Sequence, residues 1–172
     1  MCKSLYRDDG RRGGGIKVYY RDNISVTEID NFTGISNTCE KLFLKVTIDK
    51  IGPVIIGSLY RPPQTIVNDF CHELEHILNS IGNSRCIIVG DININTMNIS
   101  CDNSVLQYVN TFSQHGYINE INDATYHSPI TNSDISCLDH ILTNFYVPKE
   151  SMIIKPNIAD HHAVCLTLQT YI

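Results

Sequence analysis

Acidic, amide and imidazole side chains follow several of the apolar segments of this 172-residue sequence. The clearest case is SRCIIVGDININ, in which the apolar run 86–89 predicts a buried strand, and Asp91 and Asn93 follow soon after it. Side chains of these types move protons and hold metal ions in proteins. The same two residues can instead cap their own backbone in an Asx turn, so their spacing leaves both interpretations open.

Three further polar sites have the same position relative to the predicted strands. They are Tyr60 with Arg61, Asp139 within CLDHIL, and Asp160 with His161 within ADHHAV. Because ligands of open α/β folds bind at strand ends, the joint occurrence favours a functional site. Taken singly, Tyr60 also fits a rim aromatic, Asp139 a solvent-facing strand residue, and His161 a surface or core histidine.

The elements that must position these side chains alternate between strand and helix patterns. Strands are predicted over 16–20, 24–29, 41–48, 52–60, 86–90, 117–121, 137–143, 151–155 and 162–168. The first two are expected to form a hairpin through residues 21–23. Apolar residues at three- and four-residue steps predict amphipathic helices over 65–81 and about 104–114, and 122–136 has the composition of a polar loop. This pattern predicts a sheet-rich α/β domain.

Composition narrows the class of protein. At this length, a hydrophobic content of 42% suffices for one domain with its own core. The formal net charge of -5 argues against general coating of nucleic acid, so a bound polyanion would need a local basic patch or a metal ion. Seven cysteines without a C-x-x-C pair fit neither a zinc site nor a disulfide framework, and favour a reducing compartment. We find no signal-peptide pattern and no apolar segment of membrane-spanning length, and therefore expect an intracellular protein.

The ordered motifs LYRPP, IIVGDIN, SCLDHILTN and ADHHAV resemble successive signatures of the endonuclease/exonuclease/phosphatase superfamily. The opening RRGGGIKVYY, the word YRPP, and the series formed by Thr125, Ser136 and LDHILTN are similar to the endonuclease domain of jockey-type non-LTR retrotransposons. The resemblance runs from about Gly13 to Leu168, which is nearly the whole chain.

This resemblance implies a fold and a domain organisation. The fold is an α/β sandwich of the four-layer DNase I-like kind, with two packed, mostly antiparallel sheets flanked by helices, here without the first strands and helix. Residues 1–12 are then expected to be a disordered or residual N-terminus, and residues 13–172 a partial domain. Without its first strands, such a domain is expected to expose unpaired strand edges and apolar surface.

The resemblance also implies a phosphodiesterase site. Phosphodiester hydrolysis needs an activated water, relief of charge on the phosphate oxygens and stabilisation of the leaving oxygen, which a divalent metal with carboxylates and imidazole can supply. Asp91 would position or deprotonate the water, and Asn93 would hold the phosphate or the nucleophile. His161 would face the scissile phosphate, with Asp139 accepting a hydrogen bond from its ring.

The remaining implied roles concern the metal and the substrate. Asp160 would bind the metal, Mg²⁺ or Mn²⁺, while Tyr60 and Thr125 would contact phosphate groups. DNA is the implied substrate and the nucleus the implied location, with no membrane partner and no small-molecule cofactor. The principal glutamate ligand of the family has no counterpart, because Glu28 and Glu40 lie in segments that match later family strands. Since magnesium sites rely on few protein carboxylates, strongly impaired activity is expected.

Two other interpretations remain open. One is an enzyme of the same fold that acts on a soluble or lipid phosphoester, such as an inositol-phosphate phosphatase or a sphingomyelinase-like phosphodiesterase. The other is a non-catalytic remnant, either inert or a weak nucleic-acid binder. The basic residues that could support binding gather near the N-terminus, where such a cluster is commonly a solvated end: Arg7, Arg11, Arg12, Lys17 and Arg21.

Overall fold

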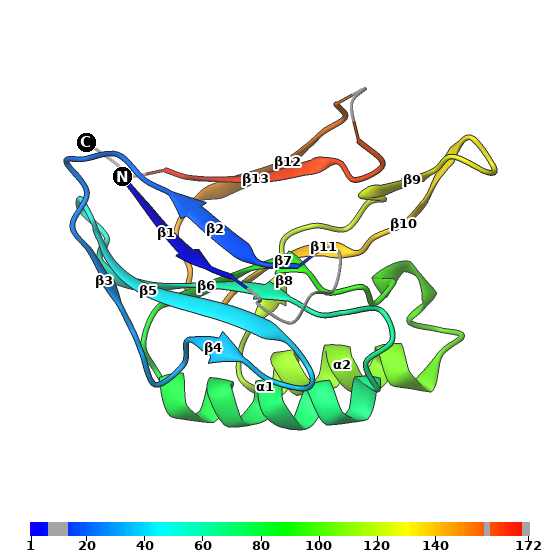
Figure 1. Cartoon of the computed structure of the whole chain (residues 1–172), viewed down its shortest axis with the longest axis horizontal. Helices are drawn as coiled ribbons and strands as arrows, with labels where there is room; N and C mark the ends of the chain where they lie inside the picture. The colour runs from blue at the N-terminus through cyan, green and yellow to red at the C-terminus, as the bar shows by residue number, and fades with distance from the viewer. Residues whose placement is uncertain (7–13, 157–158, 170–172) are drawn as a thin grey trace.

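The computed structural model describes residues 1–6, 14–156 and 159–169, and its centre is a seven-stranded sheet (Figure 1). The strand order is β3-β5-β6-β7-β11-β8. The seventh strand, β4, also pairs with β5, next to β3 on the same edge. Its strands are β3 (Val26–Glu28), β4 (Gly34–Ile35), β5 (Glu40–Ile48), β6 (Gly52–Tyr60), β7 (Cys86–Asp91), β8 (Ile118–Asn119) and β11 (Asp139–Thr143). Strands β6 and β7 pair in parallel, and the other pairs described in this sheet are antiparallel.

Two hairpins lie over one face of this sheet, and the helices lie over the other (Figure 1). The hairpins pair β1 (Cys2–Leu5) with β2 (Ile16–Tyr19), and β12 (Lys149–Ile154) with β13 (Ala163–Leu168). A third hairpin, β9 (Tyr126–Ser128) with β10 (Ser133–Ser136), projects from one end. The predicted arrangement of two packed, mostly antiparallel layers with helices is confirmed.

The second layer consists of separate hairpins in the described structure. Among the residues that the structure describes, β2 pairs only with β1, and β13 pairs only with β12. Each of these hairpins therefore has an edge that pairs with no other described strand. Unpaired edges of this kind favour association with other strands.

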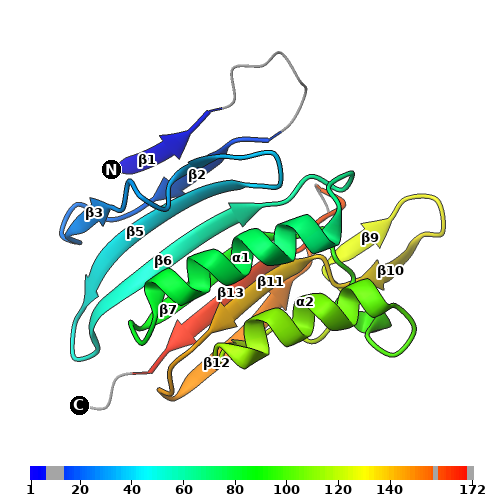
Figure 2. The ribbon, with the colours of Figure 1, turned by 90° about the horizontal axis from the view of Figure 1, so that it is seen from below.

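The helices α1 (Val67–Ile81) and α2 (Asn103–Gln114) run side by side across their face of the sheet (Figure 2). Helix α1 begins four residues after the last proline of YRPP and ends at Gly82, whose N–H donates to Leu78 O at 3.0 Å and whose positive φ of 57° turns the chain out of the helix. Helix α2 is capped by Asp102, which accepts the Ser104 N–H at 2.8 Å, and is preceded by the 3₁₀ turn η1 (Thr96–Asn98). Both helices fall within two residues of the ranges predicted from periodicity.

The central sheet is buried on both faces because alternate residues enter two different cores. Ile88 of β7 packs in the core under the helices, whereas Ile87 packs in the core under β13. Asp91 lies four residues after Ile87 on the same strand, so it projects from the same face, toward β13.

None of the described helices is both long and apolar enough to cross a membrane.

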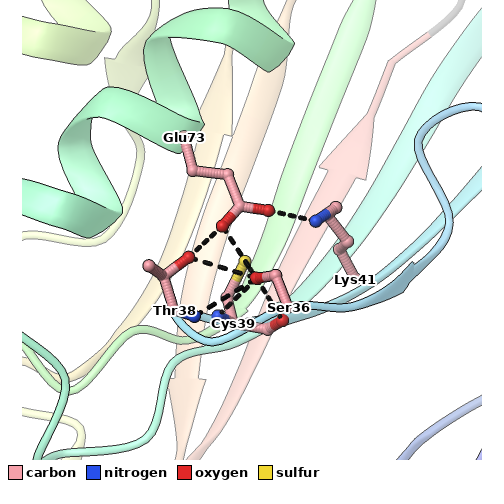
Figure 3. Close-up of polar contacts among 5 residues, drawn as sticks. All are labelled: Ser36, Thr38, Cys39, Lys41 and Glu73. Atoms are coloured by element: carbon pink, nitrogen blue, oxygen red, sulfur yellow. Dashed lines mark hydrogen bonds and ion pairs between the residues drawn. The ribbon is translucent and has the colours of Figure 1, made fainter.

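A carboxylate on α1 fastens the turn between β4 and β5 to the helix layer (Figure 3). Glu73 accepts hydrogen bonds from Ser36 Oγ at 2.7 Å and from Thr38 Oγ1, and it forms an ion pair with Lys41. Burial raises the pKa of Glu73, but its hydrogen bonds with Lys41, Thr38 and Ser36 outweigh burial and leave that pKa below its ordinary value. The ionised carboxylate thus holds this corner of the sheet.

The structure corrects three expectations about chain organisation. Residues 16–20 and 24–29 do not form a hairpin, because β2 pairs with β1 and β3 pairs with β5 as the chain passes between layers. Within the predicted N-terminal tail, Cys2–Leu5 forms strand β1 instead of lacking structure, while positions 7–12 lie outside the described residues. The predicted loop 122–136 contains the hairpin β9–β10.

Candidate active site

Each of four neighbouring strands of the central sheet, β5, β6, β7 and β11, carries one polar residue, and these four residues form a row across the sheet. Glu40 on β5 lies opposite Tyr60 on β6. Tyr60 in turn lies opposite Asp91 on β7, which lies opposite Asp139 on β11. Residues that are directly opposite project from the same face of a sheet. The sheet therefore brings together three residues singled out from the sequence, Tyr60, Asp91 and Asp139.

His161 reaches this row from the residues that precede β13. Its Nδ1 lies 2.8 Å from Asp139 Oδ2. Because an ionised carboxylate only accepts hydrogen bonds, Nδ1 carries the proton, and Nε2 is the ring nitrogen that remains for other contacts. The ring of Tyr126 meets the His161 ring edge-on, with centroids 5.2 Å apart, and a backbone bridge joins the two residues. Tyr126 thus supports the histidine from the side.

Burial and neighbouring charges shift the pKa values of Asp91 and His161. Burial raises the pKa of Asp91 above its ordinary value, and the nearby Asp139 carboxylate raises it further. The hydrogen bond with Asp139 raises the pKa of His161, and partial burial of the ring opposes this shift. Asp91 is therefore a stronger base than an exposed aspartate, and His161 keeps its second proton to a higher pH than a free histidine.

A buried arginine, Arg61, stabilises the turn after Asp91 through hydrogen bonds to its backbone. Arg61 is 2% exposed, and its guanidinium donates to Ile92 O at 3.2 Å and to Asn93 O at 3.1 Å. The Asn93 amide returns a hydrogen bond to Arg61 O at 2.8 Å. The Asn93 backbone N–H donates to Asp91 Oδ1 at 3.2 Å, so Asp91 and Asn93 do form an Asx turn as well as lying at the row.

Thr125 is fully buried behind the row. Its Oγ1 accepts the backbone N–H groups of Leu138 at 2.9 Å and Asp139 at 3.0 Å. Its own backbone binds Ser136 O through the N–H at 2.8 Å. These contacts place Thr125 as a support for the start of β11.

Glu40, the fourth residue of the row, holds the glycine-rich segment that leads into β2. It is completely buried, and its carboxylate accepts the backbone N–H of Gly15. A side chain on Gly14, which has a φ of 85°, would place a Cβ 2.5 Å from Glu40 Oε1. Gly14 and Gly15 are therefore explained by close approach of the backbone to a buried carboxylate.

Three residues of the site could hold a metal ion. Asp91, Asp139 and His161 each offer a ligand atom, and these atoms lie within 4.8 Å of one another. Two carboxylates and an imidazole suit a divalent cation such as Mg²⁺ or Mn²⁺. Asp160 is exposed beside His161 and is not one of this group, and its backbone oxygen accepts the His127 N–H at 2.7 Å.

A pocket of about 410 Å³ adjoins the row between the central sheet and β13. Asp91 and Asp139 lie at its polar end, and its walls are apolar side chains from β6, β7, β11 and β13, including Ile56, Val89, Val164 and Leu166. The carboxylates are therefore next to a surface that excludes water from one side. Low local polarity is consistent with the raised pKa of Asp91.

The sequence reasoning missed Tyr126 and Asp134. Both lie on the hairpin β9–β10, which was expected to be a loop. The alternation of Thr125, Tyr126 and His127 on two sides of a short strand is the signal that could have revealed Tyr126. No sequence signal identifies Asp134, because two of its three partners, Lys155 and His162, come from a distant segment.

Comparisons with known proteins identify the family and the fold of the chain. A family model described as endonuclease-reverse transcriptase matches residues 54–165. The endonuclease domain of TRAS1, a telomere-specific non-LTR retrotransposon, is similar with a TM-score of 0.79 and 14% identity, over 99% of this chain and 80% of that chain. Among the curated proteins, none matches the sequence.

Two further solved structures have a similar fold. An endonuclease/exonuclease/phosphatase family protein from Leptotrichia buccalis has a TM-score of 0.63 and 13% identity, covering 99% of this chain and 71% of that one. TDP2 of D. rerio, complexed with a single-strand DNA product, has a TM-score of 0.61 and 14% identity, covering 99% and 77%. At such identities the likeness shows the DNase I-like fold alone. Because the family model covers more than half of the sequence, the chain belongs to the endonuclease-reverse transcriptase family.

Proposed function

We propose that this chain is a phosphodiesterase of the retrotransposon endonuclease type, with DNA as its substrate and low activity in its present form. The observation that carries the proposal is the convergence of Asp91, Asp139 and His161, whose ligand atoms lie within 4.8 Å of one another. Paired carboxylates with an imidazole, beside a pocket at the strand ends of an α/β sheet, suit hydrolysis of a phosphate ester.

In the proposed reaction, water attacks phosphorus as the bond from phosphorus to the leaving oxygen breaks. Asp91 accepts the proton of the attacking water, a role favoured by its raised pKa. Asn93, in the adjoining turn, orients the phosphate or the water. His161, fixed by Asp139 through Nδ1, directs Nε2 to the phosphate and stabilises its negative charge. Tyr60, beside Asp91 in the row, contacts a phosphate oxygen.

A divalent metal, Mg²⁺ or Mn²⁺, would supply charge relief on the phosphate oxygens when bound. Asp91 and Asp139 would hold it through carboxylate oxygens, and Asp160 would add an exposed carboxylate from the position next to His161. This set provides fewer buried carboxylates than a site with a dedicated glutamate. We therefore expect slow turnover and weak retention of the metal.

The substrate class is tested by offering two kinds of ester to the full chain. Supercoiled plasmid reports nicking, and a soluble phosphomonoester reports release of inorganic phosphate. The proposal predicts nicking without phosphate release. Phosphate release with intact plasmid would instead favour a phosphatase of the same fold, and neither reaction in a folded sample would favour a non-catalytic remnant.

A further inference from the structure

The carboxylate of Asp134 joins three segments that surround the candidate site. Its Oδ1 lies 2.9 Å from Nδ1 of His127 and 3.0 Å from Nε2 of His162. Its Oδ2 forms an ion pair with Lys155. His127 belongs to β9, while Lys155 and His162 stand before and after the pair Asp160 and His161 in the sequence. One carboxylate therefore binds both sides of the segment that carries His161.

Backbone contacts continue this attachment on either side of His161. The His127 N–H donates to Asp160 O at 2.7 Å, and the His162 N–H donates to Thr125 O at 2.7 Å. The two residues that flank His161 are thus each hydrogen-bonded to the backbone of β9 or of the residue directly before it. Thr125 Oγ1 also accepts the Asp139 N–H, and Tyr126 contacts the His161 ring, so these two neighbouring residues touch both members of the pair formed by Asp139 and His161.

His162 depends strongly on the contact with Asp134. Its side chain is 5% exposed, and its Nδ1 is buried without a hydrogen-bond partner in the described part of the chain. Nε2 is therefore the ring nitrogen through which His162 is held. If Asp134 no longer accepted this bond, the buried ring would have neither nitrogen paired, which is unfavourable enough to displace it.

We propose that Asp134 is a positioning residue that fixes His161 against Asp139 by holding His127, His162 and Lys155 together. The inference deepens the proposed function, on which its catalytic meaning depends. Hydrogen bonds to a charged acceptor are the stronger kind, and in Asp134→Asn the neutral amide oxygen accepts more weakly while the NH2 group turns a donor toward Lys155, so the amide does not replace the carboxylate. Residues of this supporting kind commonly change affinity or activity by roughly ten- to a hundredfold when removed.

The test compares Asp134→Asn with a matched control, Glu73→Gln. Glu73 also accepts from three side chains, but it does so on the helix side of the sheet (Figure 3). NMR of the full chain measures hydrogen exchange at the His127 and His162 amides and the ring Nδ1–H resonance of His161. Asp134→Asn is expected to speed exchange at both amides about tenfold, and to shift or broaden the ring resonance. Glu73→Gln is expected to leave these signals in place.

Two results would overturn the proposal: unchanged signals in Asp134→Asn, or equal changes in both variants, which would indicate general loosening. Lys155→Met provides a second variant that removes one exposed arm of the cluster, and it is expected to speed exchange at His162 by a smaller factor. Unchanged exchange in Lys155→Met would contradict the shared attachment if Asp134→Asn did not fold. Altered signals in Asp134→Asn together with absent nicking by the wild type would support the positioning role and reject the proposed function.

Discussion

Nδ1 of His161 lies 2.8 Å from Oδ2 of Asp139, and this contact links the central sheet to the strand layer above it. Asp139 begins β11, and His161 precedes β13, so the hydrogen bond depends on the packing of two layers. It also fixes the ring so that one nitrogen is occupied by protein and the other is left for a ligand. Such a pair is a common way to orient an imidazole for catalysis.

Substituting Asp139→Asn is expected to lower the pKa of His161. The hydrogen bond with the Asp139 carboxylate is the main cause of the raised value, and partial burial, which remains in the variant, acts in the opposite direction. The midpoint is measured from the Cε1 proton of His161 by NMR titration, with His161→Gln to assign the signal. An unchanged midpoint would show that the carboxylate does not act on the ring as described.

Metal binding should depend on Asp91 more than on Asp160. Asp91 belongs to the three-residue group with converging ligand atoms, whereas Asp160 is exposed and outside that group. In a Mn²⁺ titration followed by calorimetry, Asp91→Asn is expected to weaken affinity by roughly tenfold or more, and Asp160→Asn by less. The reverse order would make Asp160 the principal ligand and Asp91 a residue that acts on water alone.

The stability of the fold should fall as the pH is lowered from 6.5 toward 4 because of His140. This ring is 1% exposed, it lies 2.9 Å from the Tyr108 hydroxyl through Nδ1, and burial lowers its pKa to about 4. Between these pH values His140 is protonated in the unfolded chain but not in the folded chain. The free energy of unfolding therefore falls, by about 3 kcal/mol at the acid end of the range.

Urea unfolding at several pH values measures this dependence. His140→Gln is expected to flatten the slope between pH 6.5 and 4, although it also loses some stability at neutral pH. The control is His76→Gln, which changes an exposed histidine on α1 and should retain the slope. Equal slopes in the wild type and in His140→Gln would reject His140 as the source.

Gly90→Ala should be much more damaging than Gly116→Ala. A Cβ on Gly90 would lie 1.7 Å from the carbonyl oxygen of Leu59 on the parallel partner strand, directly before Asp91. We expect a loss of at least about 3 kcal/mol of unfolding free energy, since the backbone must move. Gly116 has a φ of 75° with open space around it, so alanine there should cost only about 1 kcal/mol. Similar costs in chemical denaturation would contradict this account.

The sequence predicted the helices and most central strands because burial on one or two faces leaves a periodic pattern. The pairing of β2 with β1 could not be predicted, since an edge strand with alternating burial fits several partners. For the site, motif order was enough to select Tyr60, Asp91, Asp139 and His161. The burial of Thr125 and the role of Asp134 depend on tertiary contacts that spacing does not encode.

The most direct test of the central claim is nicking of supercoiled plasmid by the purified chain with Mg²⁺, beside EDTA and Asp91→Ala. The account predicts slow nicking that is abolished by the chelator and by the substitution. Nicking at the same rate in Asp91→Ala would contradict a site built around Asp91. Absence of nicking in a folded wild-type sample would contradict the proposed activity itself.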